Sequence, residues 1–292
     1  MFDTHCHLNF KAFDGIVDNV IADAKKAGVT HTVVPGTDIE SSKKAVEIAS
    51  HHEGIYAAVG IHPHHVFDMV KLKASHFVPT LSVGTSRDKQ NDDLKAKVRE
   101  IESLLDNERV VAVGEIGLDR HSYQKTKYRE YRVGEEFISL QKEFFVKQLE
   151  LAKKYNKSVI IHSRETTTDI LQLTNDNWDE WFAGHTVFHC CEPNEDMLDF
   201  AIKHHIYIGV DGDITYSPKK VEFIKKVPVE ILVLETDAPF LLPEPLKSQK
   251  IYPNKPENLK IIAEFIAKIR GEATADLIQT TTENAMKLFG LT

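Results

Sequence analysis

The chain opens with Met1-Phe2-Asp3-Thr4-His5-Cys6-His7, an apolar start followed by two histidines one residue apart. On a strand successive side chains point to opposite faces, so His5 and His7 share one face and Cys6 lies on the other. Two imidazoles on one face at the end of a strand can hold the same metal ion. Alone, the pair fits a metal site about as well as it fits two partly exposed histidines near a terminus, so the rest of the chain decides.

Short β-rich or apolar segments recur along the chain, and helical patterns separate them. We expect eight strands, at residues 2–4, 32–34, 55–59, 110–113, 158–161, 186–188, 206–208 and 230–234. The expected helices cover residues 14–26, 41–51, 92–106, 136–155, 194–203, 218–226, 258–270 and 273–289, with one more starting near residue 168.

Alternating strands and helices are typical of a parallel sheet with crossover helices. Eight such units in one chain favour a closed (β/α)₈ TIM-type barrel, which usually takes ~250 residues, over a doubly wound sheet. No linker, repeat or low-complexity tract divides the sequence. We therefore expect an α/β fold with a single domain over residues 1–292.

The composition, with 42% hydrophobic and 27% charged residues, is that of an ordinary globular protein. No apolar run approaches the ~20 residues that cross a bilayer, so we expect a cytosolic protein without membrane contact. Three cysteines fit a reducing compartment. The net charge of −8 argues against a protein that coats nucleic acid, but not against an enzyme whose metal ions supply positive charge locally. Nothing calls for an obligate protein partner.

Metal-binding side chains follow six of the eight expected strands. Because catalytic groups of a barrel sit where strands end and βα loops begin, these residues should meet on one rim. They are His5, His7, His62, Glu115, His162, His189 and Asp237. Each has an ordinary explanation when taken alone: His162 as a satisfied strand-end histidine, Asp237 as a turn cap. Their joint placement favours a metal site.

Four histidines and two carboxylates, without His62, are more ligands than one hydrolytic metal ion needs, since such an ion keeps a position open for water. Two divalent ions that share a bridging carboxylate would use them all. We expect His5, His7 and Asp237 to share one ion, because strands one and eight are neighbours in a closed barrel. His162 and His189, on strands five and six, would share the other.

Glu115 lies in a Gly-Glu-Ile-Gly turn after strand four, in the middle of the strand order, and is the natural bridge between the two ions. Cys190 and Cys191 follow the strand-six histidine and could be thiolate ligands, but inert buried cysteines are the commoner case. The basic loop at residues 120–134 is ordinarily a solvated surface; on the active rim it becomes a candidate for phosphate contacts.

In six stretches the chain resembles the TatD-type metal-dependent deoxyribonucleases of the amidohydrolase superfamily. The stretches, in the family's order, are Asp3–Leu8, Gly60–His64, Gly114–Asp119, Ile161–Arg164, His189–Cys190 and Glu235–Pro239. The resemblance implies the six ligands above, with magnesium, manganese or zinc as the ion, and it places His62 near the reacting phosphate. It also implies hydrolysis of DNA, often exonucleolytic. The substrate class rests on the resemblance alone.

We therefore expect a 3'-5' exodeoxyribonuclease that acts on single-stranded or frayed DNA ends, with RNA as an open second substrate. Asp237, Glu115 and His62 are the expected catalytic residues, with Asp237 taking the proton of the attacking water. The residues expected to contact substrate or to orient the groups around it are His62, His64, Arg164, Arg120 and Glu235, with further loop contacts from His121 and Lys125.

Two stretches depart from the family pattern. After the sixth-strand motif the family usually has Phe-Ser-Gly or similar, where this chain has Cys191-Glu192-Pro193. After the eighth-strand motif it usually has Arg-Gly and then Asn-Glu-Pro, where this chain has 247–250 (Lys-Ser-Gln-Lys) and 254–256 (Asn-Lys-Pro). The loops at 66–93 and 120–134 also look long. These departures leave the six ligands intact and leave the substrate open.

Two other functions stay open. The first is a barrel hydrolase that cleaves a small amide, lactone or phosphoester. Many members of that superfamily bridge their metals with a carboxylated lysine after strand four, and Glu115 at that position favours the nuclease-like subgroup. The second is a binding module that keeps the fold without the chemistry, and the complete ligand set argues against it.

Overall fold

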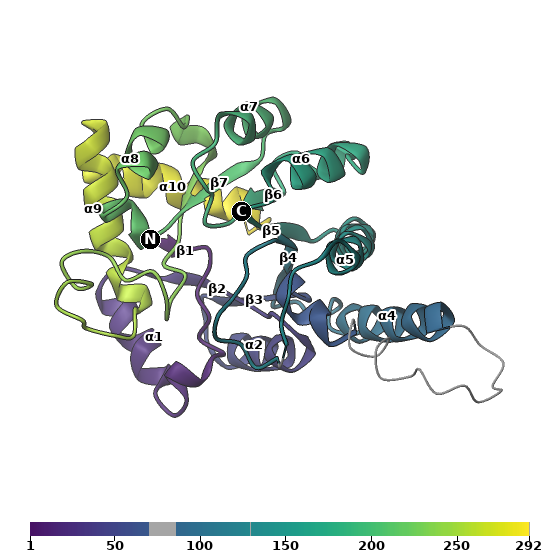
Figure 1. Cartoon of the computed structure of the whole chain (residues 1–292). Helices are drawn as coiled ribbons and strands as arrows, with labels where there is room; N and C mark the ends of the chain where they lie inside the picture. Colours follow the sequence, from purple (N-terminus) through teal and green to yellow (C-terminus); the bar gives the residue numbers. More distant parts are fainter. Residues whose placement is uncertain (70–85, 129, 292) are drawn as a thin grey trace.

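The computed structural model describes residues 1–69, 86–128 and 130–291 (Figure 1). Within these ranges eight parallel strands lie side by side in sequence order. They are β1 Phe2–Asp3, β2 His31–Pro35, β3 Ile55–Val59, β4 Val110–Asp119, β5 Ser158–Arg164, β6 Thr186–Phe188, β7 Tyr207–Val210 and β8 Leu232–Leu234. β1 meets β8, because the Thr4 amide donates to the Leu234 carbonyl at 3.0 Å and Cys6 pairs with Ala238. The sheet thus curls into a nearly closed (β/α)₈ barrel, as predicted.

Helices surround the strands (Figure 1). In the described ranges they are α1 Val17–Lys26, α2 Ile39–His51, α4 Ser86–Glu102, α5 Glu135–Lys154, α6 Thr167–Asp176, α7 Glu195–His204, α8 Pro218–Ile224, α9 Leu259–Arg270 and α10 Thr274–Leu288. Short 3-10 helices cover Lys11–Phe13, Pro63–Val66, Glu180–Phe182, Gly212–Thr215, Val229–Ile231 and Pro256–Asn258.

Local sequence explains where these elements begin. Asp38 caps α2, because its carboxylate accepts the Ser41 amide at 2.9 Å while the Ser41 hydroxyl accepts the Asp38 amide at 2.9 Å. The most regular predicted helix, α5, buries Phe137 and Phe144 against the barrel at the expected helical spacing. Burying such a side chain contributes about 1.5–3 kcal/mol, so this face anchors α5 to β4.

The main departure from expectation is β4, which continues through the stretch expected as a turn after Val113. It runs to Asp119, with a register shift against β5 between Val113 and Ile116. Gly117 has φ +149°, and a Cβ there would lie 1.9 Å from the His162 carbonyl oxygen. The glycines therefore let β4 approach β5 closely instead of ending the strand. Consequently Glu115 sits inside a strand.

The bounds of other helices and strands differ less from the predicted ones. α4 begins at Ser86 and ends at Glu102, whereas the pattern predicted 92–106. The start of the expected last strand, at 230–231, belongs to a 3-10 helix instead. The part of the expected long loop at residues 70–85 lies outside the described residues.

α10 closes the end of the barrel where the strands begin. The Ser158 hydroxyl donates to the Leu288 carbonyl, and the Phe2 and Phe289 rings lie 5.7 Å apart. Asn284 donates from Nδ2 to the Leu232 carbonyl at 2.9 Å. With that end sealed, the carboxyl ends of the strands are left as the open end.

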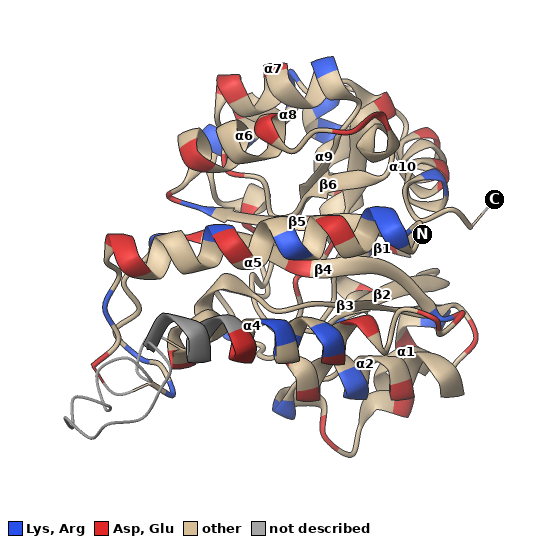
Figure 2. Cartoon of the chain, turned by 90° about the vertical axis from the view of Figure 1, so that its right-hand side faces the viewer, with Lys and Arg blue, Asp and Glu red and all other residues tan. Residues whose placement is uncertain are grey.

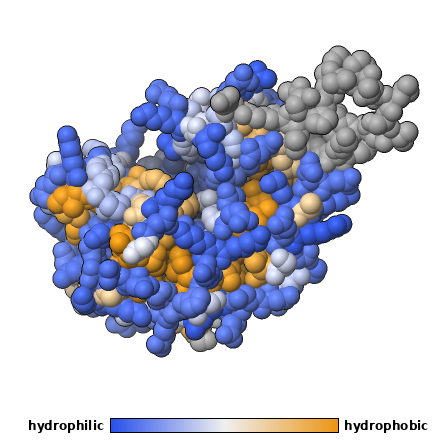
Figure 3. Space-filling view, turned by 90° about the horizontal axis from the view of Figure 1, so that it is seen from below, coloured by the Kyte–Doolittle hydropathy of each residue, from blue (hydrophilic) through white to orange (hydrophobic). Residues whose placement is uncertain are grey.

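The surface is of mixed charge. Lysine and arginine alternate with aspartate and glutamate along α4 and α5 (Figure 2), so this face offers no broad basic area. Hydrophilic residues cover most of the face in Figure 3, with hydrophobic ones showing between them. Among the helices that the structure describes, none has the length and apolarity needed to cross a bilayer.

Candidate metal centre and active site

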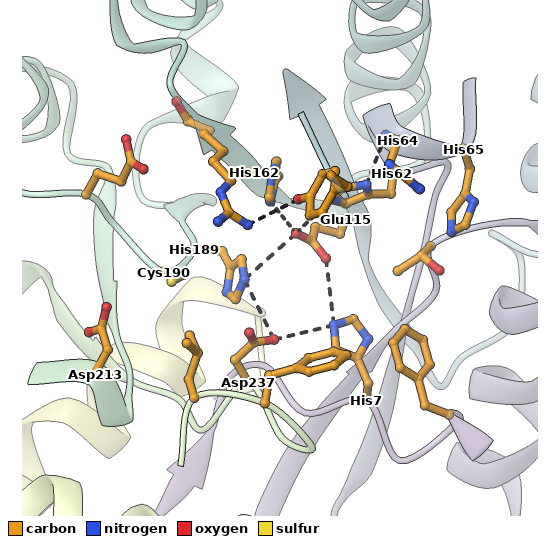
Figure 4. A pocket seen from close by; sticks show the side chains of 18 of the residues that line it. His7, His62, His64, His65, Glu115, His162, His189, Cys190, Asp213 and Asp237 are labelled. Carbon is orange, nitrogen blue, oxygen red and sulfur yellow. Dashed lines mark hydrogen bonds and ion pairs between the residues drawn. The ribbon is translucent and has the colours of Figure 1, made fainter. Parts of the chain in front are cut away.

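The open end of the barrel gathers all six side chains predicted as metal ligands. They are His5, His7, Glu115, His162, His189 and Asp237. Donor atoms of His5, His7 and Glu115 lie within 4.8 Å of one another, and so do those of Glu115, His162 and His189. Figure 4 shows Glu115 between His162 on one side and His7 on the other.

The first group lies where the ends of β1 and β8 meet. His5 Nε2 is 3.1 Å from His7 Nε2 and 3.4 Å from Glu115 Oε2. Asp237 Oδ1 is 3.5 Å from His7 Nε2 and 3.8 Å from His5 Nε2. It is also 4.0 Å from His189 Nε2, so Asp237 stands beside both groups rather than in the first alone.

The second group uses the other oxygen of Glu115. His162 Nδ1 is 2.7 Å from Glu115 Oε1, and His189 Nε2 is 3.8 Å from the same atom. One carboxylate thus turns one oxygen to the β1 histidines and the other to the β5 and β6 histidines. A carboxylate held in this way could serve both donor groups if each of them bound an ion.

Backbone contacts hold Asp237 in place. Its amide donates to the His5 carbonyl at 2.9 Å, which ties the end of β8 to the first histidine. Asp237 has φ +49°, in the left-handed region, which aspartate enters more readily than most residues other than glycine. This conformation and the bond to His5 fix where the carboxylate leaves the backbone.

Two buried carboxylates stand behind the histidines. Glu235 Oε1 lies 3.1 Å from His189 Nδ1, and Asp119 Oδ2 lies 3.3 Å from His162 Nε2. In each case the carboxylate faces the ring nitrogen opposite the one that faces Glu115. Carboxylates in this position orient metal-binding histidines and fix their tautomer.

Asp119 is the last residue of one of the six motifs, but it had no predicted role. The residue is fully buried and also accepts the Tyr123 hydroxyl at 2.7 Å and the His121 amide at 2.7 Å. Had β4 been predicted to reach Asp119, the two-residue alternation of a strand would have placed it on the face of Glu115. His62, Asp119 and His162 also form a compact donor group, within 4.8 Å.

The electrostatics of the cluster suit a cation. Burial by itself raises the pKa of Glu115, but the surrounding histidines, His62 and His189 foremost, hold it well below its usual value. Burial lowers the pKa of His5 to about 4. In the part of the chain that the structure describes, neither Glu115 nor Asp237 pairs with a lysine or arginine. A buried carboxylate pair surrounded by imidazole nitrogens therefore fits divalent metal ions.

The cluster faces a cavity of about 810 Å³. Of the residues predicted to contact substrate, His62, His64, Arg164 and Lys125 line it. His62 Nε2 lies 3.5 Å from Glu115 Oε1, beside the cluster.

Three residues expected to contact substrate do not line the cavity. The guanidinium of Arg120 bonds Glu135 at 2.7 Å and Asp169 at 2.8 Å, because two carboxylates from α5 and α6 draw it outward. His121 pairs with Glu165 at 2.7 Å. Glu235 lies behind His189, so it can orient that ring and does not line the cavity.

The departures from the family pattern also have a place in the structure. Cys191 is buried, whereas Glu192 and Pro193 line the cavity. Lys247 Nζ lies over the Tyr216 ring, 3.0 Å from its centroid.

A family model described as TatD related DNase matches residues 2–290. The chain belongs to this family. Membership confirms the resemblance predicted from six motifs and, with it, the expectation of a hydrolase.

Similar proteins cover nearly the whole chain. The uncharacterized metal-dependent hydrolase YabD of Bacillus subtilis is 32% identical over 99% of this chain and 98% of its own length. The 3'-5' ssDNA/RNA exonuclease TatD of Escherichia coli is 30% identical over 100% of this chain and 99% of its own. The crystal structure of YjjV, a TatD homologue from Escherichia coli, superposes with a TM-score of 0.78 at 27% identity, over 99% and 98% of the two chains.

Proposed function

We propose that this member of the TatD-related DNase family is a metal-dependent 3'-5' exonuclease that hydrolyses phosphodiester bonds at single-stranded or frayed DNA ends, with RNA as a second substrate to test. One observation carries the proposal: Glu115 turns one oxygen to each of two histidine pairs beneath an open cavity. The polarity and the single-stranded substrate are supported by a relative that carries them in its name. The free cysteines support a cytosolic setting.

We assign two divalent ions, magnesium, manganese or zinc, to the two donor groups around Glu115. His5 and His7 would hold one ion and His162 and His189 the other, with Asp237 beside both. Ions held by these residues would lower the pKa of a bound water towards ~7 and would polarise the phosphoryl oxygen.

The side chains of this protein divide the remaining work. Asp237 would take the proton of the attacking water, because its carboxylate lines the cavity although its side chain is only 14% exposed. His62 and Arg164 line the same cavity and can hold the phosphate. Glu235 and Asp119 keep the two histidines in orientation.

The cavity favours a single strand over an intact duplex. A single-stranded end can lower its backbone between the walls to the metal cluster, whereas a duplex is too wide to do so. The cations that line the cavity are few, among them Arg164, Lys125 and Lys220. Because the salt dependence of binding scales with the number of phosphates neutralised, binding should weaken only shallowly as salt rises.

One observation keeps a second candidate in view, a barrel hydrolase for a small amide, lactone or phosphoester. Glu192 replaces the family's usual small residue and lines the cavity, and its Oε2 accepts the Glu165 amide at 3.4 Å. A carboxylate at the cavity wall repels a polyanion more than a small neutral substrate.

The deciding experiment offers the purified protein single-stranded DNA, duplex DNA, RNA, a small phosphodiester, an amide and a lactone, each with magnesium, manganese or zinc. We expect stepwise shortening of single-stranded DNA from its 3' end, much faster than that of blunt duplex. Fast hydrolysis of the amide or lactone, with no cleavage of any nucleic acid, would instead establish the second candidate.

A further inference from the structure

An exposed phenylalanine stands at the edge of the cavity, and the metal chemistry does not use it. Among the described residues five large hydrophobic side chains are exposed, and Phe240, at 50%, is the one of these that also lines the cavity. Phe240 lies three residues after Asp237, in the turn that follows β8.

Phe240 completes a small aromatic wall. The rings of His7 and Phe10 are stacked, with centroids 4.3 Å apart and planes at 15°. Phe240 meets both edge-on, at 6.3 Å from His7 and 6.0 Å from Phe10, with planes at 69° and 74°. Since its contacts with that stack are edge-to-face and half of its surface stays exposed, part of the ring is free to contact a ligand.

The turn that carries Phe240 is held firmly without any ligand. The Phe240 amide donates to the Asp237 carbonyl at 2.9 Å, and the Asn254 amide donates to the Pro239 carbonyl at 3.1 Å. Asn254 is fully buried and donates from Nδ2 to the Thr236 carbonyl at 3.0 Å. An exposed aromatic ring fixed this way is pre-organised for a flat partner, because binding need not order the loop.

We propose that Phe240 is the stacking surface for the nucleobase of one of the two nucleotides that flank the scissile phosphate, with Phe10 as its support. The inference rests on the proposed function as a nuclease of single strands. The position of Phe240 supports the inference. The ring lies against His7, a member of the candidate metal cluster, so a phosphate at the cluster would bring a neighbouring base to the ring. Stacking of this kind accepts every base, because every base has a π-face.

The test combines two changes: removal of the Phe240 ring from the protein and removal of one base from the substrate. Substrates are a single-stranded oligonucleotide and two versions in which a tetrahydrofuran abasic analogue replaces the nucleotide on one or the other side of the bond that is cleaved first. Enzymes are the wild type, Phe240→Ala, Phe240→Leu and Phe240→Trp. Tyr252→Ala is the matched control, because Tyr252 is an aromatic residue of the same loop, 62% exposed, that does not line the cavity.

With the intact oligonucleotide, Phe240→Ala and Phe240→Leu should raise KM about tenfold, equivalent to about 1.4 kcal/mol, with kcat within twofold. Phe240→Trp should restore KM, and Tyr252→Ala should match the wild type. Removing the base at one of the two positions should raise KM about tenfold for the wild type and leave KM nearly unchanged for the Phe240→Ala variant. Metal content should be equal in all variants.

A second readout avoids turnover. In the Asp237→Asn background, 2-aminopurine at the sensitive position should lose fluorescence on binding when Phe240 is present and keep it in Phe240→Ala. The inference is overturned if the KM increases caused by removing the ring and by removing the base multiply at both positions. It is also overturned if Phe240→Ala contains less metal than the wild type. If either of these outcomes is found and the wild type still cleaves the intact oligonucleotide, the inference is wrong and the proposed function stands. A wild type that cleaves no nucleic acid overturns both.

Discussion

Two groups of buried charged residues lie near one another at the open end of the barrel, and they are neutralised differently. In the first, Lys220 is 3% exposed, and its Nζ lies 3.1 Å from Asp211 Oδ2 and 2.6 Å from Asp213 Oδ1. In the second, Glu115 and Asp237 have only imidazoles as partners in the described chain. Figure 4 shows Asp213 and Cys190 apart from Glu115, on the far side of His189.

The difference separates a structural charge cluster from a ligand site. Burial alone lowers the pKa of Lys220, yet the two aspartates raise it well above its usual value, so the lysine stays charged and serves as the cation of its own cluster. Among the described residues the Glu115 cluster holds no lysine or arginine. Burial alone would lower the pKa of His162 and His189, yet the neighbouring carboxylates raise them to about 9 and about 10. Imidazoles can give up these protons to a divalent cation, whereas Lys220 cannot act as a metal ligand while it stays charged. Charged residues buried with a built-in partner contribute to the fold, whereas those without one indicate a bound ion.

The largest effect should come from Glu115→Gln. The wild type, prepared without chelator, should carry about two divalent ions per chain, and the variant should lose metal from both positions together with activity, because its amide cannot bridge two cations. Elemental analysis and the nuclease assay measure both. Cys6→Ala is the control: Cys6 is buried on the opposite face of the strand and should affect packing only. Equal losses in the two variants would mean that the strand faces are misassigned.

Asp237→Asn should come next, with turnover reduced by about 10²- to 10⁴-fold while substrate binding changes little. The amide oxygen can still coordinate a metal weakly but cannot take a proton from water. Steady-state kinetics and binding to a single-stranded oligonucleotide separate the two effects. Near-normal turnover in this variant would exclude Asp237 as the base.

Lys220→Met addresses the other half of the comparison. Removing the lysine leaves the fully buried Asp211, and Asp213 with only 24% of its side chain exposed, without a cation. The free energy of unfolding should therefore fall by about 3–5 kcal/mol in urea denaturation. Lys225→Met, which removes an exposed pair with Glu222 at the other end of α8, should change the free energy of unfolding by less than about 0.5 kcal/mol. Metal content should stay the same in both. A Lys220→Met protein as stable as the wild type would contradict the structural role.

The smallest effect should follow from Asp119→Asn. Its carboxylate accepts both the Tyr123 hydroxyl and His162, and an amide cannot serve all of its present donors. Metal affinity should fall by about 10- to 100-fold in competition with a chelating dye. Asp169→Asn, a rim carboxylate that pairs with Arg120, should leave the affinity unchanged. If both variants bind metal equally well, Asp119 does not position the ligand.

Much of the site was predictable because barrel topology converts order along the chain into position in space. Once eight strands alternate with helices, residues at strand ends have to meet on one rim, and His5, Glu115 and Asp237 do so. Asp119 was missed for a local reason: two glycines in the stretch suggested a turn, and the close approach of β4 to β5 that makes them necessary is a contact between distant segments.

Substrate contacts were harder to predict, since a side chain's direction depends on its neighbours. Arg120 lies beside the site in sequence, but carboxylates from two helices hold its guanidinium away from the cavity. Phe240 had no predicted role at all, because a single phenylalanine just after the eighth-strand motif gives no sign of being exposed at a cavity edge.

The sequence by itself therefore determined the class of fold, through the alternation of strands and helices, and the family, through six motifs in order. The residue types at strand ends also indicated which side chains gather as candidate metal ligands. Tertiary structure alone decided which carboxylates support the histidines, which cations reach the cavity and which buried charges already have a partner. The physical reason is range: periodicity is a property of neighbouring residues, while pairing and exposure depend on side chains that folding brings together from far apart, as with Asp119 and His162.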